Sequence, residues 1–274
     1  MCKLFSWPLN KKGSCFATNH RRLTGVGRSK NMMTTEQRVN ELGYPCLIVY
    51  QYFTAANAIR CIETRRLRIS TIHDLNDPFE VRPVLNGADP NERADQERFL
   101  LEWRKRMAQE VGLLCFSATK TNPLIWSHYA DRHRGIAIGF EYTVDNSRLL
   151  PVSYPENNER PIVDFSDTSS TSTEKGQEIF FTKAKDWKYE EEYRELVAIR
   201  DCQASEGSYF TTHIVWNHMG QQQRVPKEVI LGAHCTVCSS YIRKTLVQSG
   251  FIDVAVMKAR LSEDKYSVNS ETAP

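Results

Sequence analysis

Residues 113–142, LLCFSATKTNPLIWSHYADRHRGIAIGFEY, decide how we expect this chain to fold. Two apolar runs of strand length flank a polar segment, and the second run is rich in β-branched and aromatic residues. Asn122 stands where a helix N-cap belongs, Pro123 takes the first helical position, and Gly135 follows where a C-cap glycine is common. The order therefore predicts a strand, a short helix and a second strand.

The predicted short helix is dense in hydrogen-bonding and aromatic side chains. These are Trp126, Ser127, His128, Tyr129, Asp131 and His133. A helix with a purely structural role does not need so many polar aromatic groups within two turns. We therefore place the functional site here, with His128 and Tyr129 as groups that bind phosphate or ribose oxygens. Trp126 could stack on a ligand ring or simply close the core.

Outside this stretch, apolar strands and amphipathic helices follow one another along residues 43–261 without an internal repeat. Many strands of differing spacing with a few helices are typical of an α+β domain, here with a mixed or antiparallel central sheet and flanking helices. Residues 1–42 are basic and lack a hydrophobic period, so we expect a disordered extension. Residues 262–274 form a polar tail that we expect to be frayed.

The composition of the 274-residue chain bounds its class. With 41% hydrophobic residues it can bury one good core, and a formal charge of +3 does not by itself argue for a nucleic-acid groove. No apolar run approaches the roughly 18 residues of a membrane span, and no signal-peptide pattern is present. We expect a cytoplasmic protein that does not enter a membrane and whose eight cysteines stay reduced.

The acidic run at residues 190–192 is the candidate for catalysis. On a strand, Glu190, Glu192 and Arg194 would share one face because side chains alternate. A fixed carboxylate stabilises the positive charge that develops at a sugar carbon when its glycosidic bond breaks. A second carboxylate could orient the acceptor. The alternative is a solvated acidic edge in which Glu192 pairs with an arginine.

Two further groups of residues bear on the site. Asn76 and Asp77 belong to a turn-forming cluster directly after a predicted strand, so we expect them to line the same cleft as His128. Cys235 and Cys238 form a lone CxxC pair, a weak signal that leads us to assign no metal. The sequence contains no Walker loop, GxGxxG fingerprint or GxSxG elbow.

Three separated motifs identify a family resemblance over roughly residues 46–260. They are NDPFE at 76–80, NPLIWSHYADRHRGIAIGF at 122–140 and WKYEEEYR at 187–194. In this order they resemble the domain-of-unknown-function 2971 family, found mainly in bacteria. That resemblance implies little about activity.

A more distant resemblance is to ADP-ribosyltransferases of the DNA-modifying toxin type. Its segments are IVYQYFTAANAIRCIETRRLRIS at 48–70, CFSATKTNPLIWSHYA at 115–130 and EEEYRELVAI at 190–199. The customary histidine of the first strand would fall at Tyr50 or Tyr52, and the serine-rich second motif is reduced to Ser117.

The resemblance implies an enzyme that uses NAD as a substrate and modifies a nucleic acid or protein in a bacterial toxin or phage-defence setting. Glu192 and Glu190 would be catalytic, and Glu192→Gln is expected to reduce turnover about a hundredfold while leaving folding nearly untouched. The expected NAD-binding residues are Tyr50, Tyr52, Asn76, Asp77, Ser117, Trp126, His128, Tyr129 and Arg194. The alternatives are a non-catalytic nucleotide- or nucleic-acid-sensing module, and a hydrolase or nuclease that uses His128, Asp131 and the glutamate pair. The acceptor and the oligomeric state stay open.

Overall fold

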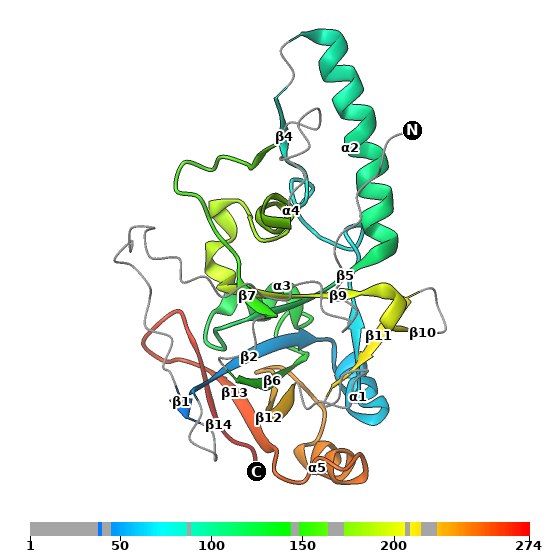
Figure 1. The fold of residues 1–274 in the computed structure, drawn as a ribbon. Helices are drawn as coiled ribbons and strands as arrows, with labels where there is room; N and C mark the ends of the chain where they lie inside the picture. The colour runs from blue at the N-terminus through cyan, green and yellow to red at the C-terminus, as the bar shows by residue number, and fades with distance from the viewer. Residues whose placement is uncertain are drawn as a thin grey trace.

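The computed structural model describes residues 38–39, 45–86, 89–143, 148–163, 173–205, 209–214 and 224–274. Its centre is a nine-stranded sheet in the order β14-β13-β12-β6-β2-β5-β9-β7, with β1 paired to β2 (Figure 1). The strands are β1 (Arg38–Val39), β2 (Pro45–Phe53), β5 (Val111–Ser117), β6 (Ile136–Thr143), β7 (Leu149–Pro151), β9 (Glu192–Ala198), β12 (Val225–Leu231), β13 (Ala255–Leu261) and β14 (Val268–Thr272). Only β12 and β13 run parallel among these pairs, so the expected α+β fold with a mixed, mostly antiparallel sheet is confirmed.

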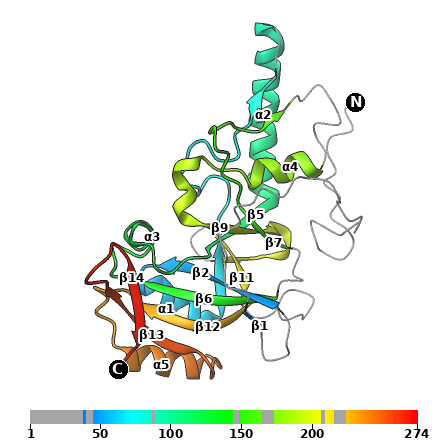
Figure 2. The same ribbon diagram turned by 90° about the vertical axis from the view of Figure 1, so that its left-hand side faces the viewer.

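The remaining elements surround this sheet. They are α1 (Ala55–Thr64), α2 (Pro90–Glu110), α3 (Pro123–Tyr129), α4 (Thr173–Phe180), α5 (Ser239–Gln248), two 3-10 helices (Lys185–Glu190 and Ile199–Asp201), a sheet of β3 (Arg66–Ile69), β10 (Gln203–Ser205) and β11 (Tyr209–His213), and the pair β4 (Val84–Leu85) and β8 (Ile162–Val163). Figures 1 and 2 show α2 projecting away from the central sheet, with β4 and α4 on the same side.

The central stretch folds as its sequence predicts, except at the end of the helix. Asn122 caps α3 by accepting a hydrogen bond from the Leu124 amide at 2.9 Å. The chain then turns through residues 131–133, which all have positive φ angles, and Gly135 does not act as the C-cap. A Cβ atom at Gly135 would lie 2.0 Å from the carbonyl oxygen of Phe53. The glycine is therefore needed for a close backbone approach.

Alternating side chains along β2, β6 and β12 enter two different cores, and β5 and β9 also contribute to a third with α2. One core packs α1 and α5 against side chains such as Val49, Ile138 and Val229. On the opposite face, Tyr50 and Trp126 belong to a smaller cluster beneath α3. Strand alternation therefore separates the α1–α5 side from the α3 side.

The central sheet parts between β2 and β5. The two strands share one register pair in the described chain, Tyr50 opposite Ser117, whereas β2 and β6 pair along residues 46–53. Strands β5 and β9 also pair along their full length. Beyond that single pair, the facing backbone edges of β2 and β5 therefore border the opening between the two halves of the sheet.

The structure describes the two ends of the chain to different extents. The extension expected at residues 1–42 lies outside the described residues except for β1. The expectation of a frayed tail from residue 262 is wrong, because β14 pairs with β13 and buries Val268 and Ala273. Strand β13 pairs with β12 on one edge, and the backbone N–H and C=O groups on its other edge can bond a polar strand as well as an apolar one. No helix in the described ranges is long and apolar enough to cross a membrane.

Candidate functional site

A cleft of about 370 Å³ lies where β2 and β5 part. Eight of the residues proposed from the sequence line it: Tyr50, Tyr52, Asn76, Ser117, Tyr129, Glu190, Glu192 and Arg194. They come from β2, β5, β9, α3, the NDPFE loop and the 3-10 helix Lys185–Glu190. The cleft volume is near the lower end of small-ligand sites, which suits one ring and its attached sugar.

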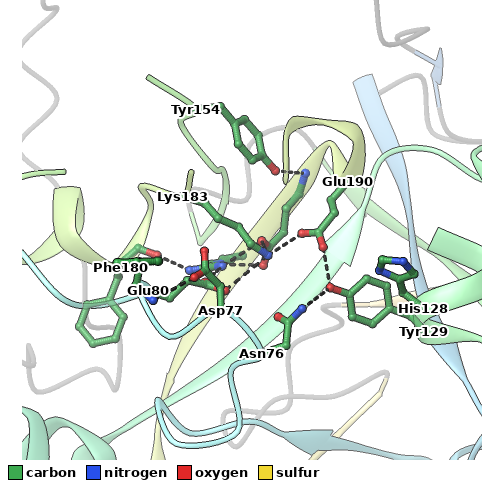
Figure 3. Close-up of polar contacts among 12 residues, drawn as sticks. Asn76, Asp77, Glu80, His128, Tyr129, Tyr154, Phe180, Lys183 and Glu190 are labelled. Carbon is green, nitrogen blue, oxygen red and sulfur yellow. Dashed lines mark hydrogen bonds and ion pairs between the residues drawn. The ribbon is translucent and has the colours of Figure 1, made fainter. Parts of the chain in front are cut away.

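The floor of the cleft is a buried ion cluster of Glu80, Lys183, Glu190, Glu192 and Arg194 (Figure 3). Lys183 Nζ lies 2.6 Å from Glu190 Oε2, 3.3 Å from Glu192 Oε2 and 3.4 Å from Glu80 Oε1. One ammonium group therefore bridges three carboxylates. Buried ionic groups of this kind require such pairing, because each unpaired charge in the interior costs several kcal/mol.

Arg194 completes the ion cluster. Its Nε and Nη2 atoms donate to the two carboxylate oxygens of Glu192 at 2.6 and 2.9 Å, and Nη2 also contacts Glu80 Oε2. Its Nη1 donates to the Phe180 carbonyl at 2.8 Å. By formal charge, three carboxylates against two cations give the ion cluster one net negative charge beside the cleft.

The two glutamates have pKa values shifted in opposite directions. Burial raises the pKa of Glu192, but the charge and hydrogen bonds of Arg194 together with the charge of Lys183 outweigh it, so the pKa falls to about 2. Burial also raises the pKa of Glu190, where Lys183 offsets only part of the effect, so this pKa stays above its ordinary value. Burial lowers the pKa of Lys183, but the carboxylates around it raise the pKa above its ordinary value and keep the amine charged. Of these two glutamates, Glu190 is therefore the one that accepts a proton first.

Tyr129 connects α3 to Glu190. Its hydroxyl donates to Glu190 Oε1 at 2.5 Å and accepts a hydrogen bond from Asn76 Nδ2 at 2.9 Å (Figure 3). Burial, and next the negative charge of Glu190, raise the pKa of Tyr129. The phenol therefore stays protonated and works as a donor. Tyr154 accepts a hydrogen bond from the Glu192 amide at 3.0 Å and further fixes the start of β9.

Glu190 reaches the ion cluster through an irregular backbone turn, and not through the strand alternation that the sequence predicts. Glu190 ends the 3-10 helix Lys185–Glu190, Glu191 adopts a left-handed conformation with φ 45°, and β9 begins only at Glu192. Ser117 Oγ donates to the Glu190 carbonyl at 2.6 Å and holds this turn against the end of β5. Glu190 and Glu192 therefore meet at Lys183, while Glu191 does not line the cleft.

Residues 125–195 match the model of a family described as a protein of unknown function, DUF2971. Over these residues the chain is similar to that family. The matched segment contributes Tyr129, Lys183, Glu190, Glu192 and Arg194 to the site. No curated protein and no solved structure matches the chain.

Residues outside the matched segment 125–195 complete the cleft. Asn76 and Glu80 come from the NDPFE loop, and Tyr50 and Tyr52 from β2. The Tyr52 hydroxyl donates to the Thr119 carbonyl at 2.8 Å, and the Tyr50 hydroxyl donates to Glu228 at 2.6 Å. Both tyrosines therefore present ring surface to the cleft with their hydroxyl groups already bonded.

Three residues expected in the cleft lie elsewhere. Trp126 is fully buried and donates from Nε1 to the Lys120 carbonyl at 2.8 Å, so it closes the core above β2. Asp77 accepts the Phe79 amide at 2.9 Å and lines a neighbouring cavity, because the turn after it reverses the chain. His128 lies on the outward side of α3, next to Tyr189, and does not line the cleft. The expectation that Asp77 and His128 share one cleft is therefore wrong.

The other His, Cys and Asp candidates stand apart from the cleft. Asp131 is exposed and pairs with Arg134 at 2.7 Å. Cys235 is buried, whereas Cys238 is exposed at the N-cap of α5. Among the residues described, no group of three or more His, Cys, Asp and Glu side chains is arranged to hold a metal ion.

Glu80, Cys115 and Lys183 also line the cleft but are not among the residues predicted from the sequence. Glu80 ends the NDPFE motif, and Lys183 follows the apolar run 179–181, which is itself buried. Fully buried lysine and glutamate side chains are rare unless they are paired, so the position of Lys183 close to an apolar run is a signal that could have identified it. Cys115 offers no such signal, because a cysteine inside an apolar strand is ordinary core.

A second hollow extends the cleft past β3. Its volume is about 500 Å³, and it shares Tyr52, Arg68 and Tyr129 with the cleft. Arg60 and Arg66 add two further cations to its wall. Arg66 is held by Thr211, to which its Nε donates at 2.6 Å. Positive charge therefore lies at one end of the site and the negative ion cluster at the other.

Proposed function

We propose that the cleft binds NAD and that the chain is an ADP-ribosyltransferase-like enzyme. The three segments on which the resemblance rests lie on the neighbouring strands β2, β5 and β9, around one cleft. The observation that carries the proposal is the ion cluster, whose Glu190 and Glu192 carboxylates line this cleft and are held by Lys183 and Arg194.

The charge of the ion cluster suits cleavage of a nicotinamide–ribose bond. As this bond breaks, its electron pair leaves with nicotinamide and positive charge develops on the ribose carbon and ring oxygen. The positive charge moves from the nicotinamide ring to the ribose in this step, and one net negative charge fixed beside the ribose in a water-poor wall stabilises it there. Glu192 stays ionised throughout, because its pKa of about 2 lies far below neutral pH.

Glu190 suits the second half of the transfer. The acceptor's lone pair forms the new bond to the ribose carbon, and the acceptor loses a proton. The raised pKa of Glu190 makes this carboxyl the one that receives the proton and later passes it to solvent. Tyr129 donates to Glu190 and fixes its orientation.

The hollow beside the cleft suits the rest of the dinucleotide. Arg60, Arg66 and Arg68 lie in its wall, and guanidinium groups bind phosphate oxygens in a fork geometry. In this arrangement the nicotinamide riboside occupies the cleft and the diphosphate extends toward the arginines.

Release of nicotinamide from NAD, followed by chromatography, tests the proposal. We expect Glu192→Gln to slow release about a hundredfold, as loss of one transition-state stabiliser typically does. Glu190→Gln should slow transfer to the acceptor more than it slows release. Glu191→Gln is the matched control, because this neighbouring glutamate does not line the cleft. Wild-type rates in all three variants would exclude these carboxylates from catalysis.

A non-catalytic sensing module is the second candidate. It is favoured by the small cleft volume and by the ion pairs that already occupy both oxygens of Glu192. It predicts NAD or nucleotide binding by calorimetry without nicotinamide release. A nuclease that uses Asp131 has less support, because Asp131 is exposed and paired with Arg134 outside the cleft.

A further inference from the structure

A large hollow between α2 and β4 is lined by apolar residues and by charged residues that are nearly all cations. It measures about 850 Å³, and we call it the arginine groove. Its charged lining residues are Arg82, Arg93, Glu97, Arg98, Arg104 and Arg160. Five cations against one anion make this the most unbalanced of the hollows described above, although the formal charge of the whole chain is only +3.

Neighbouring groups only partly neutralise the arginine groove. Arg104 donates to the backbone carbonyls of Glu80 and Val81, at 3.1 Å to Glu80, and backbone carbonyls carry no formal charge. Burial, and next the positive charge of Arg82, lower the pKa of Arg104, which indicates cations crowded together. Arg98 pairs with Asp95, but both side chains are more than 70% exposed, and such pairs contribute little.

An exposed aromatic ring lies at the end of the arginine groove. Phe79 is 60% exposed, and the Arg160 guanidinium lies 5.6 Å from its ring centroid. Both line a cavity of about 290 Å³ that shares Arg82 and Arg160 with the groove. The far wall of that cavity contains Glu80 and Lys183, which also line the cleft.

We propose that the arginine groove and Phe79 bind single-stranded nucleic acid. The arginines contact backbone phosphates, and a base stacks on the Phe79 ring beside Arg160. Guanidinium groups that follow a backbone, together with an exposed ring, are the features by which proteins bind single strands without sequence preference. An acidic peptide would use the arginines but gain nothing from a stacking platform. As an assignment of the acceptor this inference rests on the proposed function, whereas strand binding itself does not.

Fluorescence anisotropy of a labelled single-stranded 12-mer, with the full chain and no NAD, tests the inference. We expect log K to fall linearly with log salt. Arg82→Ala and Arg98→Ala should each weaken binding about fivefold at 0.1 M salt and reduce the salt slope, since one phosphate contact contributes about 0.7 to it. Arg106→Ala is the matched control, because Arg106 lies on the same helix, is paired with Glu110 and does not line the groove.

The Phe79→Ala variant separates stacking from charge. It should weaken binding at least about fivefold at every salt concentration while leaving the salt slope unchanged, because a stacked base involves no counterion release. All substituted side chains are at the surface or partly exposed, and circular dichroism checks that each variant is folded.

Three results would overturn the inference. The first is no binding of the oligonucleotide even at low salt. The second is an equal loss on Arg106→Ala and on the groove variants, which would mean a diffuse charge effect. The third is competition by polyglutamate as strong as by unlabelled oligonucleotide, which would assign the groove to an acidic protein instead. NAD is absent from these measurements. Strand binding can therefore be absent while nicotinamide is released, or present while nicotinamide is not released.

Discussion

At the scale of single residues, the local environment gives two identical carboxyl groups different pKa values. Glu192 is held by Arg194 through two hydrogen bonds, and its pKa is lowered to about 2. Glu190 accepts hydrogen bonds from the Lys183 ammonium and the Tyr129 hydroxyl, yet burial keeps the pKa of Glu190 raised. Titratable neighbours whose pKa values are pushed apart are a common arrangement for acid and base roles.

This difference predicts unequal effects on stability. Glu192→Gln removes one partner of a buried ion pair and should lower the free energy of unfolding by about 3–5 kcal/mol at pH 7. Glu190→Gln should cost much less, because folding does not favour the ionised form of a group whose pKa is raised. The sequence alone led us to expect that Glu192→Gln leaves folding nearly untouched, and the ion pairs of Glu192 change that expectation.

Urea denaturation of both variants checks this prediction, and its pH dependence has a definite sign. The folded-state pKa of Glu192 is depressed, so its stabilisation is present above the ordinary carboxyl pKa of about 4.3 and is lost as the pH falls toward 2. The gap between wild type and Glu192→Gln should therefore shrink over that window. A gap that stays constant from pH 7 to pH 2.5 would show that the ionised carboxylate does not cause it.

Tyr129 should set the pH dependence of the reaction. The Tyr129 hydroxyl lowers the pKa of Glu190, so Tyr129→Phe should raise this pKa further. If Glu190 accepts the acceptor's proton, the rise of the ADP-ribosyl transfer rate with pH should shift to higher pH in the variant. A pH–rate profile measures the shift, with Tyr189→Phe as the control outside the cleft. An unshifted profile with lower rate at every pH would limit Tyr129 to positioning.

At the scale of elements, the turn between α3 and β6 depends on a close backbone contact. A Cβ atom at Gly135 would collide with the Phe53 carbonyl, and the Gly135 amide donates to the Ala130 carbonyl at 2.7 Å. Because both contacts are to backbone, the strands β2 and β6 would have to move apart. The position of α3, and with it Tyr129, depends on this turn.

Gly135→Ala should therefore lower the free energy of unfolding by at least about 1–3 kcal/mol, the usual cost of overpacking. Gly250→Ala is the control. Gly250 has φ +79° but meets nothing within 4 Å, so only backbone strain of about 1–2 kcal/mol applies. Thermal unfolding of both variants measures the difference. A smaller loss for Gly135→Ala than for Gly250→Ala would show that the strands adjust easily.

At the scale of the whole molecule, the parting of β2 and β5 creates the cleft, and α2 creates the groove. The NDPFE loop lies between them, because Glu80 belongs to the ion cluster while its carbonyl accepts a hydrogen bond from Arg104 of α2. Asn76 of the same loop holds Tyr129. A short motif therefore connects the cleft to the groove, which explains why its residues divide between two cavities.

The sequence by itself determined the local elements and the α+β class. Apolar runs of strand length predicted β5, β6 and β9, and Asn122 with Pro123 predicted the start of α3, because capping and side-chain alternation are local properties. The sequence also selected most of the residues that line the cleft, from the polar aromatic helix and the acidic run.

Only the tertiary structure decided which of these residues meet and which ionise. Lys183 reaches Glu190 and Glu192 through an irregular turn, and Glu80 reaches Arg194 from more than a hundred positions away, so no periodicity could predict the ion cluster. The frayed tail was mispredicted because strand β14 depends on the free edge of β13. Burial and distance to a partner charge set each pKa, and both are properties of the folded chain, not of its local sequence.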